Sequence, residues 1–222
     1  MLALIFGDDL RGGIMRNLII GLICCILGGC SVAPLNKSVV RQEPYKNISG
    51  KSLTISANRI VDAIELENTI GRFYNGFICM DQGALHWKGT ENFIRESTNH
   101  VRKKLEEYGY LVLGKAYSPF NDEYSNQSDL LLGGKLIDVQ ANACYSTKGV
   151  KGEAYVKVEW EVYDNRTKRI ILTLSTEGYG SLQEFDKFGD TVLFIQAFDM
   201  AIDNLLATKS FYNLLIKENK NG

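Results

Sequence analysis

Residues 153–163, EAYVKVEWEVY, decide the fold. Apolar and polar side chains alternate along this stretch with the two-residue repeat of a β-strand. One face of the strand is therefore buried and the other faces water, as is typical of an antiparallel sheet. The apolar face consists of Ala154, Val156, Val158, Trp160 and Val162, whereas Tyr155 and Tyr163 lie on the wet face with Lys157 and the glutamates.

The residues after this strand predict a hairpin. The polar run DNRTK, residues 164–168, supplies the turn, and residues 169–178 return as a second strand with Ile170, Leu172 and Leu174 facing inward. The apolar face of this hairpin needs further elements to cover it.

Two segments have the period of amphipathic helices. Residues 90–108 form the first, with Thr90 as its cap and Gly109 as its stop. Asp190 opens and caps the second, and the chain from Lys209 can continue as helix. The first apolar stripe comprises Ile94, Thr98, Val101, Leu105 and Tyr108, and the second comprises Phe194, Phe198, Ala201, Ile202 and Leu205.

Shorter apolar runs predict the remaining strands. Residues 60–64, 73–80 (FYNGFICM) and 110–113 read as short strands, and residues 129–143 contain a longer one. Adjacent glycines in that strand indicate a bulge or a close backbone approach. The order of elements favours an α+β fold: a single mixed, largely antiparallel sheet with two main helices packed on one face. The glycines are Gly133 and Gly134, and a loop with Gly83, His86, Trp87 and Gly89 precedes the first helix.

The N-terminus carries the strongest functional signal. Residues 18–27 (LIIGLICCIL) come after Arg16 and are too few to span a bilayer, which takes roughly 20 residues. Their length is that of the apolar core of a secretory signal peptide. Taken alone, this core also fits an ordinary signal peptide or a short membrane anchor, so the residues at its carboxyl end decide between these alternatives.

Those residues are Leu27-Gly28-Gly29-Cys30, which resemble the lipobox of bacterial lipoproteins. In that family the cysteine thiol is joined to a diacylglycerol, signal peptidase cuts before the cysteine, and the new amine is acylated with a fatty acid such as palmitate. The resemblance implies that Cys30 is lipidated. Ser31 is the next residue, and in enteric lipoproteins a serine rather than an aspartate there implies the outer membrane, with the protein facing the periplasm.

These features divide the chain. Asp8 and Asp9 place acid where a signal peptide carries base, so we expect Met15 to be the true start. The stretch after Cys30 has no period and contains Pro34 and Pro44, which predicts a tether that spaces the domain from the membrane. The expected parts are a signal peptide at 1–29, a lipidated N-terminus and tether at 30–51, an α+β periplasmic domain at 52–218 and a frayed tail at 219–222.

The cysteines that remain are an even pair. Cys24 and Cys25 leave with the signal peptide and Cys30 is lipidated, so Cys79 and Cys144 reach an oxidising compartment together. A disulfide between them would close a loop of about 65 residues and stabilise the fold by roughly 2–4 kcal/mol. Two separately buried thiols are the alternative, and a metal site lacks supporting histidines.

No catalytic set stands out. The only histidines are His86, beside Trp87, and His100, mid-helix and expected to be exposed. Glu159 and Glu161 share one strand face, where paired carboxylates are more often solvated than catalytic. The net charge of -1 leaves no basic field for nucleic acid. We therefore expect no enzyme, no cofactor and no metal.

The predicted domain resembles a small periplasmic domain shared by the curli-secretion lipoprotein, the N-terminal domain of the Tol-Pal translocation protein and the lipoprotein activators of penicillin-binding proteins. The resemblance covers roughly residues 60–207 and includes residues 129–138, DLLLGGKLID. The region around Cys79 departs from the pattern of those families, so their partner contacts cannot be transferred.

Two functions fit these features. The first is a structural subunit or accessory of an outer-membrane secretion or transport complex, with a type IV-like secretion apparatus as one candidate. Its partners would be the membrane, other envelope proteins and further copies of this chain in an oligomer or ring. The second is a regulator that activates a cell-wall synthase. A tether of about twenty residues reaches at most ~70 Å, which favours the membrane-proximal first role.

Overall fold

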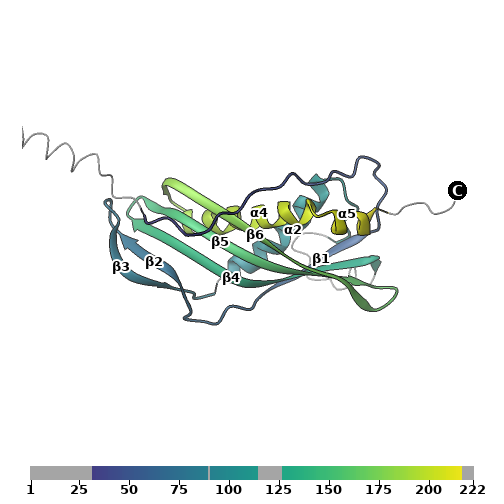
Figure 1. The fold of residues 1–222 in the computed structure, drawn as a ribbon, viewed down its shortest axis with the longest axis horizontal. Coiled ribbons are helices and arrows are strands. Elements are labelled where there is room, and N and C mark those ends of the chain that lie inside the picture. Colours follow the sequence, from purple (N-terminus) through teal and green to yellow (C-terminus); the bar gives the residue numbers. More distant parts are fainter. Residues whose placement is uncertain (1–31, 90, 115–126, 217–222) are drawn as a thin grey trace, which may run out of the picture.

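The computed structural model describes residues 32–89, 91–114 and 127–216. These residues build one six-stranded sheet with helices on one face (Figure 1), which confirms the predicted α+β fold and its mixed, largely antiparallel sheet. The elements are β1 (Ile55–Asp62), β2 (Thr69–Asn75), β3 (Met80–His86), α2 (Glu91–Glu107), β4 (Leu130–Ser146), β5 (Gly149–Asp164), β6 (Arg169–Asp186), α4 (Gly189–Leu206) and α5 (Lys209–Leu215).

The long strands β4, β5 and β6 form an antiparallel ladder, and the short strands complete its free edge. β1 pairs in parallel with the first half of β4, and β2 pairs in parallel with its second half. β3 folds back on β2 as an antiparallel edge strand. The sheet is thus long and narrow, and its two ends are built from different turns (Figure 1).

The predicted apolar face of β5 is the centre of the core. Its residues are at most 1% exposed, and Trp160 packs against Phe198 of α4 with ring centroids 5.8 Å apart. The indole Nε1 of Trp160 donates to Thr176 Oγ1 at 2.7 Å, and that hydroxyl donates to the carbonyl of Ala201 at 2.7 Å. A buried indole needs such a partner, because an unpaired donor would cost free energy.

Two glycines of β6 let α4 approach the sheet closely. A Cβ atom on Gly178 would lie 1.8 Å from the carbonyl oxygen of Ala197, and one on Gly180 would lie 2.4 Å from that of Leu193. Gly134 of β4 packs in the same way beneath the Trp160 ring, where a Cβ atom would lie 3.1 Å from the ring carbons. The close approach predicted for residues 133–134 is therefore found at Gly134 and not at Gly133, where a Cβ atom would meet only the carbonyl oxygen of Arg59 at 3.8 Å.

Side chains of α4 also cover the outer edge of β6. Gln196 accepts the N–H of Ser181, and Met200 Sδ accepts the N–H of Tyr179. Asn204 donates its amide to the carbonyl of Glu177 at 2.9 Å. These helix residues are four apart and so lie on one face, which satisfies part of an edge that would otherwise be open to another strand.

The region predicted as one strand over residues 73–80 is instead a hairpin, so that prediction was wrong. β2 ends at Asn75, residues 76–79 turn, and β3 begins at Met80. Gly76 and Cys79 have φ values of 81° and 51°, which a strand cannot hold. The predicted loop through Gly83 and His86 is accordingly part of β3.

Other boundaries differ more modestly. Ile170 is 52% exposed rather than inward, because a register shift comes directly after Val162. Residues 110–113 form only an isolated bridge between Ile55 and Val112. Asp190 lies in the first turn of α4 and accepts the N–H of Thr191, whereas Phe188 occupies the cap position. Thr90 lies outside the described residues.

The predicted tether is not free of the domain. Residues 32–51, here called the strap, run along the wet face of the sheet and onward toward α5 (Figure 1, purple). The Leu35 N–H donates to Glu153 Oε2 at 2.7 Å, and Asn142 donates to the carbonyl of Ala33 at 2.7 Å. Lys37 Nζ lies 4.4 Å from the ring centroid of Tyr155. Tyr155, predicted to be wet, is therefore only 1% exposed.

The second half of the strap attaches to the helices. Arg41 pairs with Asp203 of α4 at 3.3 Å, and Asp203 also binds Lys104 of α2 at 2.9 Å. Burial alone would lower the pKa of Lys104, but the hydrogen bond and charge of Asp203 raise it overall. Tyr45 donates its N–H to Leu206, and Asn47 is buried against the end of α2. A spacer cannot extend while it makes these contacts.

Candidate functional site

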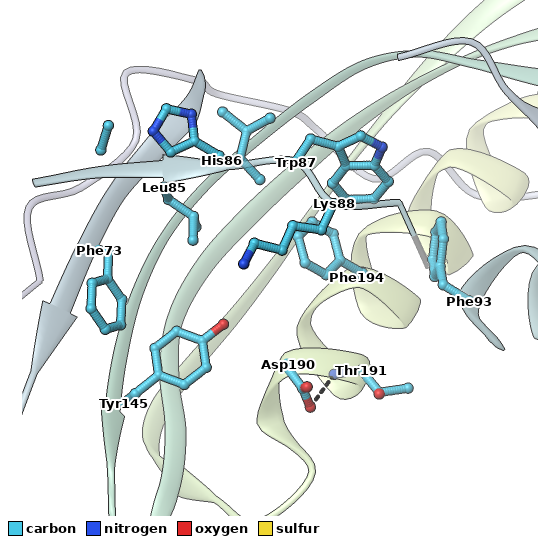
Figure 2. Close-up of a pocket in the computed structure, with 12 residues that line it drawn as sticks. Phe73, Leu85, His86, Trp87, Lys88, Phe93, Tyr145, Asp190, Thr191 and Phe194 are labelled. Atoms are coloured by element: carbon cyan, nitrogen blue, oxygen red, sulfur yellow. Dashed lines mark hydrogen bonds between the residues drawn. The ribbon is translucent and has the colours of Figure 1, made fainter. Parts of the chain in front are cut away.

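A groove of about 560 Å³ lies between the β2–β3 hairpin and the first turns of α4. It exists because β2 and β3 extend the sheet sideways beyond the area that α4 covers. Figure 2 shows side chains from both layers lining it. The lining comprises Ile70, Phe73, Ala84, Leu85, His86, Trp87, Lys88, Phe93, Tyr145, Asp190, Thr191 and Phe194.

Aromatic rings form most of the groove wall. Phe194 of α4 makes edge contacts with Trp87 and Phe93, with centroids 5.7 and 6.0 Å apart. Phe73 and Tyr145 pack together across β2 and β4 at 5.3 Å. Such a wall suits a flat apolar group, because aromatic contacts add to the free energy of burying area.

Trp87 is fixed in this wall by a hydrogen bond. Its Nε1 donates to Asp62 Oδ2 at 2.8 Å, and the residue is 3% exposed. His86 instead lies exposed at the groove's opening, with its Nδ1 2.9 Å from the carbonyl of Glu67. The burial of the two neighbours thus differs, because successive residues of an extended chain face opposite ways.

The groove has a polar rim on the α4 side. Asp190 and Thr191 stand in the first turn of the helix, and Lys88 extends over the opening from the hairpin side (Figure 2). Burial, followed by the charge of Asp190, raises the pKa of the Tyr145 hydroxyl. Tyr145 is therefore a neutral hydrogen-bonding group at neutral pH. An apolar ligand with one polar end would match this arrangement.

The histidine and the carboxylate of the groove lining both have backbone partners. His86 Nδ1 lies 2.9 Å from the carbonyl oxygen of Glu67 and 3.5 Å from the hydroxyl of Thr69, and Asp190 accepts the N–H of Thr191. No group of three or more His, Cys, Asp or Glu residues in the described part of the chain could hold a metal ion.

The cysteine pair lies at the end of the sheet next to the groove. Cys79 and Cys144 form a disulfide with Cα atoms 5.5 Å apart, joining the β2–β3 turn to β4. Tyr74 completes a small buried cluster with them, and Val32 and Phe185 pack against it. The lipobox residues Leu27, Gly28, Gly29 and Cys30 lie outside the described residues.

The other residues singled out in the sequence have structural partners. Glu159 and Glu161 both bind Lys135 of β4, and these hydrogen bonds, led by that of Glu161, raise the pKa of the lysine. His100 is not free in solvent as expected, because its Nδ1 lies 2.8 Å from Asp199 of α4. These side chains are therefore used in holding strands and helices together.

The groove itself was not predicted. Phe73, Tyr145 and Phe194 come from segments far apart in the chain, and each reads as an ordinary core residue in its own element. The only signal is the His86-Trp87 pair, which by itself indicates no more than aromatic packing. Convergence of such residues results from the pairing of β2 with β4, which no local pattern encodes.

No single helix in the described residues is long and apolar enough to cross a membrane. The pair α4 and α5, bent by 68°, meets the length and composition required only when the two are taken together.

No family model and no curated protein matches this chain. Among solved structures, a Xanthomonas campestris protein of family DUF330 is similar at 12% identity and TM-score 0.44, covering 76% of this chain and 90% of that chain. The PelC dodecamer from Paraburkholderia phytofirmans shares 14% identity at TM-score 0.37, covering 77% and 97%. A lipoprotein from Neisseria meningitidis shares 10% at TM-score 0.33, covering 60% and 87%. Likenesses this distant carry no argument about function.

Proposed function

We propose that this chain is a lipid-anchored protein of the bacterial cell envelope with a non-catalytic binding or assembly role. In this proposal Cys30 carries the lipid, and the domain faces the periplasm from the outer membrane. Its finer form is a structural subunit or accessory of a secretion or transport complex, with a type IV-like apparatus as one candidate.

The observation that carries the proposal is the open aromatic groove on a domain whose strap leads directly back to the lipobox. Aromatic side chains gathered at an opening are a common feature of protein-binding surfaces. The groove lies at the same end of the sheet as the start of the strap, since Tyr145 and Phe73 neighbour the disulfide cluster that Val32 contacts. A partner bound there would be held close to the membrane.

The strap also bears on the alternative, a regulator of a cell-wall synthase. Such a regulator has to reach away from its membrane. Because Leu35, Lys37 and Arg41 are bound to the domain, the free chain after Cys30 is much shorter than the predicted tether. The short connection supports the membrane-proximal role.

The test has two parts, the first for the anchor. Full-length protein and the Cys30→Ser variant are expressed in a bacterium and separated into membrane and soluble fractions. We expect the wild type in outer-membrane fractions and a large soluble share of the variant. Equal membrane fractionation of the two would contradict lipid anchoring at Cys30.

The second part tests the groove. The lipidated protein is purified from membranes and its partners are identified by mass spectrometry. We expect a stoichiometric multi-protein assembly that is weakened by Lys88→Glu, on the groove rim, and kept by Lys103→Glu, an exposed lysine on α2. A lone synthase partner would favour the alternative, and a free monomer would contradict both functions.

A further inference from the structure

One end of the sheet exposes large apolar side chains. The β2–β3 turn places Phe77 and Ile78 there at 58% and 57% exposed, and Met80 at the start of β3 is 56% exposed. The junction between β6 and α4 adds Phe188 at 66%. We call these four residues, with Lys148 of the β4–β5 turn and Lys187, the tip.

The tip is a rigid surface built from three turns. Phe77 packs edge-on against Phe185 of β6 with centroids 6.3 Å apart. The turn that carries Phe77 and Ile78 ends at Cys79, which the disulfide ties to Cys144 in β4. Exposed apolar residues on a mobile loop could fold inward. Phe77 and Ile78 are instead held outward by the disulfide and by the strands on each side of their turn.

The lysines of the tip lie over its rings. Lys148 Nζ lies 5.3 Å from the ring centroid of Phe77, and Lys187 Nζ lies 5.7 Å from that of Phe188. An aromatic ring with a lysine over one face suits the boundary between acyl chains and headgroups, because the ring contacts the apolar layer while the ammonium remains with phosphates.

Two acidic residues near the tip are bound to the backbone. Asp186 accepts the N–H of Phe188 at 2.7 Å, and Asp190 accepts the N–H of Thr191 at 2.8 Å. Glu184 of β6 and Asp81 of β3 are exposed, and Asp81 pairs with Arg72. Lys148 and Lys187 are the cations that lie over the exposed rings of the tip.

The strap places the anchor at this same end. Val32 packs against the cluster of Tyr74 and the two disulfide cysteines, directly behind the β2–β3 turn. Cys30 precedes Val32 by two residues, and a chain of that length spans at most ~7 Å. A lipid on Cys30 would therefore hold the bilayer surface within reach of the tip.

The opposite end of the sheet has no such relation to the anchor. Ile170 and Ile171 are 52% and 41% exposed beside the β5–β6 turn. Strands β5 and β6 separate them from the tip by roughly 50 Å at the rise of a β-strand. Exposure is similar at the two ends, so position relative to Cys30 decides which one meets lipid.

We propose that the tip is a membrane-contacting surface that seats Phe77, Ile78, Met80 and Phe188 among the acyl chains and headgroups of the phospholipid bilayer. The inference rests on the proposed lipidation of Cys30, and it deepens that function by giving the domain an orientation. The sheet then projects away from the membrane, and the groove opens beside the bilayer surface.

The experiment reads the position of the tip with tryptophan. The full chain is purified from membranes and added to vesicles of phosphatidylethanolamine and phosphatidylglycerol, with acyl chains brominated near the headgroup. Phe77→Trp and Phe188→Trp report on the tip, and Ile170→Trp is the matched control at the far end. Native Trp87 and Trp160 are buried at 3% and 1% exposed and supply a common background. Intact mass of the same samples reports lipid on Cys30.

We expect the fluorescence of each added tip tryptophan to fall roughly twofold, because interfacial side chains sit about 5–10 Å into the headgroup boundary where bromine quenches. The Ile170→Trp signal should not change. Equal quenching at both ends, or none at the tip, would overturn the proposal even where Cys30 carries lipid. Tip quenching without lipid on Cys30 would instead support the contact and contradict the anchor.

Discussion

The two faces of the long sheet are covered in different ways. On one face α4 lies directly on β5 and β6, and glycines at 178 and 180 bring helix and strand backbones into contact. On the other face the strap makes isolated polar contacts, such as that of Leu35 with Glu153. The helix face therefore sets the stability of the fold, whereas the strap face determines where the anchor joins it.

The largest expected effect is on the helix face. Gly178→Val would drive a side chain into the α4 backbone, so we expect the free energy of unfolding to fall by about 3 kcal/mol or more. Gly133→Val is the matched control, because a Cβ atom there has only the carbonyl oxygen of Arg59 nearby, at 3.8 Å. Urea unfolding measures both, and similar losses for the two variants would contradict the close packing of α4.

The disulfide is next, because it ties the tip to the sheet. Replacing Cys79 and Cys144 together by alanine should lower the free energy of unfolding by about 2–4 kcal/mol, chiefly by loosening the constraint on the unfolded chain. Denaturant unfolding gives the value. Mass analysis of the wild-type protein under non-reducing conditions tests whether the disulfide is formed. Two free thiols at Cys79 and Cys144 would show that it is absent.

A smaller effect is expected on the strap face. Lys37→Met keeps most of the side-chain stem but removes the charge beside Tyr155 and Asp138, which is worth less than about 1 kcal/mol. The global unfolding midpoint should therefore barely move, while protease cleavage within residues 32–51 speeds up. Lys103→Met, on exposed α2, should change neither. If Lys37→Met unfolded the whole domain, the separation of the two faces would be wrong.

The smallest expected effect on stability depends on pH and involves Asp164 at the β5–β6 turn. Hydrogen bonds from the backbone, led by that of Arg166, hold the pKa of Asp164 below its ordinary 3.8. A carboxyl group whose pKa is lower in the folded than in the unfolded state stabilises the fold fully above its unfolded-state pKa. This stabilisation is lost as the pH falls through its folded-state pKa. Asp164→Asn should be slightly less stable than wild type at neutral pH, and this difference should shrink below pH 3.8. A difference that stays constant into acid would contradict the role of the charge.

Local periodicity explains how much of the fold could be predicted from the sequence. The alternation over residues 153–163 and the helical stripes of α2 and α4 are repeats within single elements, so they could be identified without partners. The hairpin at 73–80 was missed because Gly76 lies within an apolar run, and its turn depends on pairing of β2 with β4.

The strap and the groove could not be predicted for a related reason. The strap has no period, and Pro34 and Pro44 lack the N–H groups that a ladder needs. Its contacts join residues far apart in the chain, such as Leu35 with Glu153 and Asn47 with Gly109. The groove likewise joins Phe73, Tyr145 and Phe194 only after the sheet has formed.

Lipid anchoring at Cys30 is tested most directly by the intact mass of the wild-type protein extracted from bacterial membranes. We expect a mature chain that begins at Cys30 and carries the added mass of a diacylglycerol and an amide-linked acyl chain. A chain that retains residues before Cys30, or one that begins there with an unmodified thiol, would show that the domain is not held to the membrane in this way.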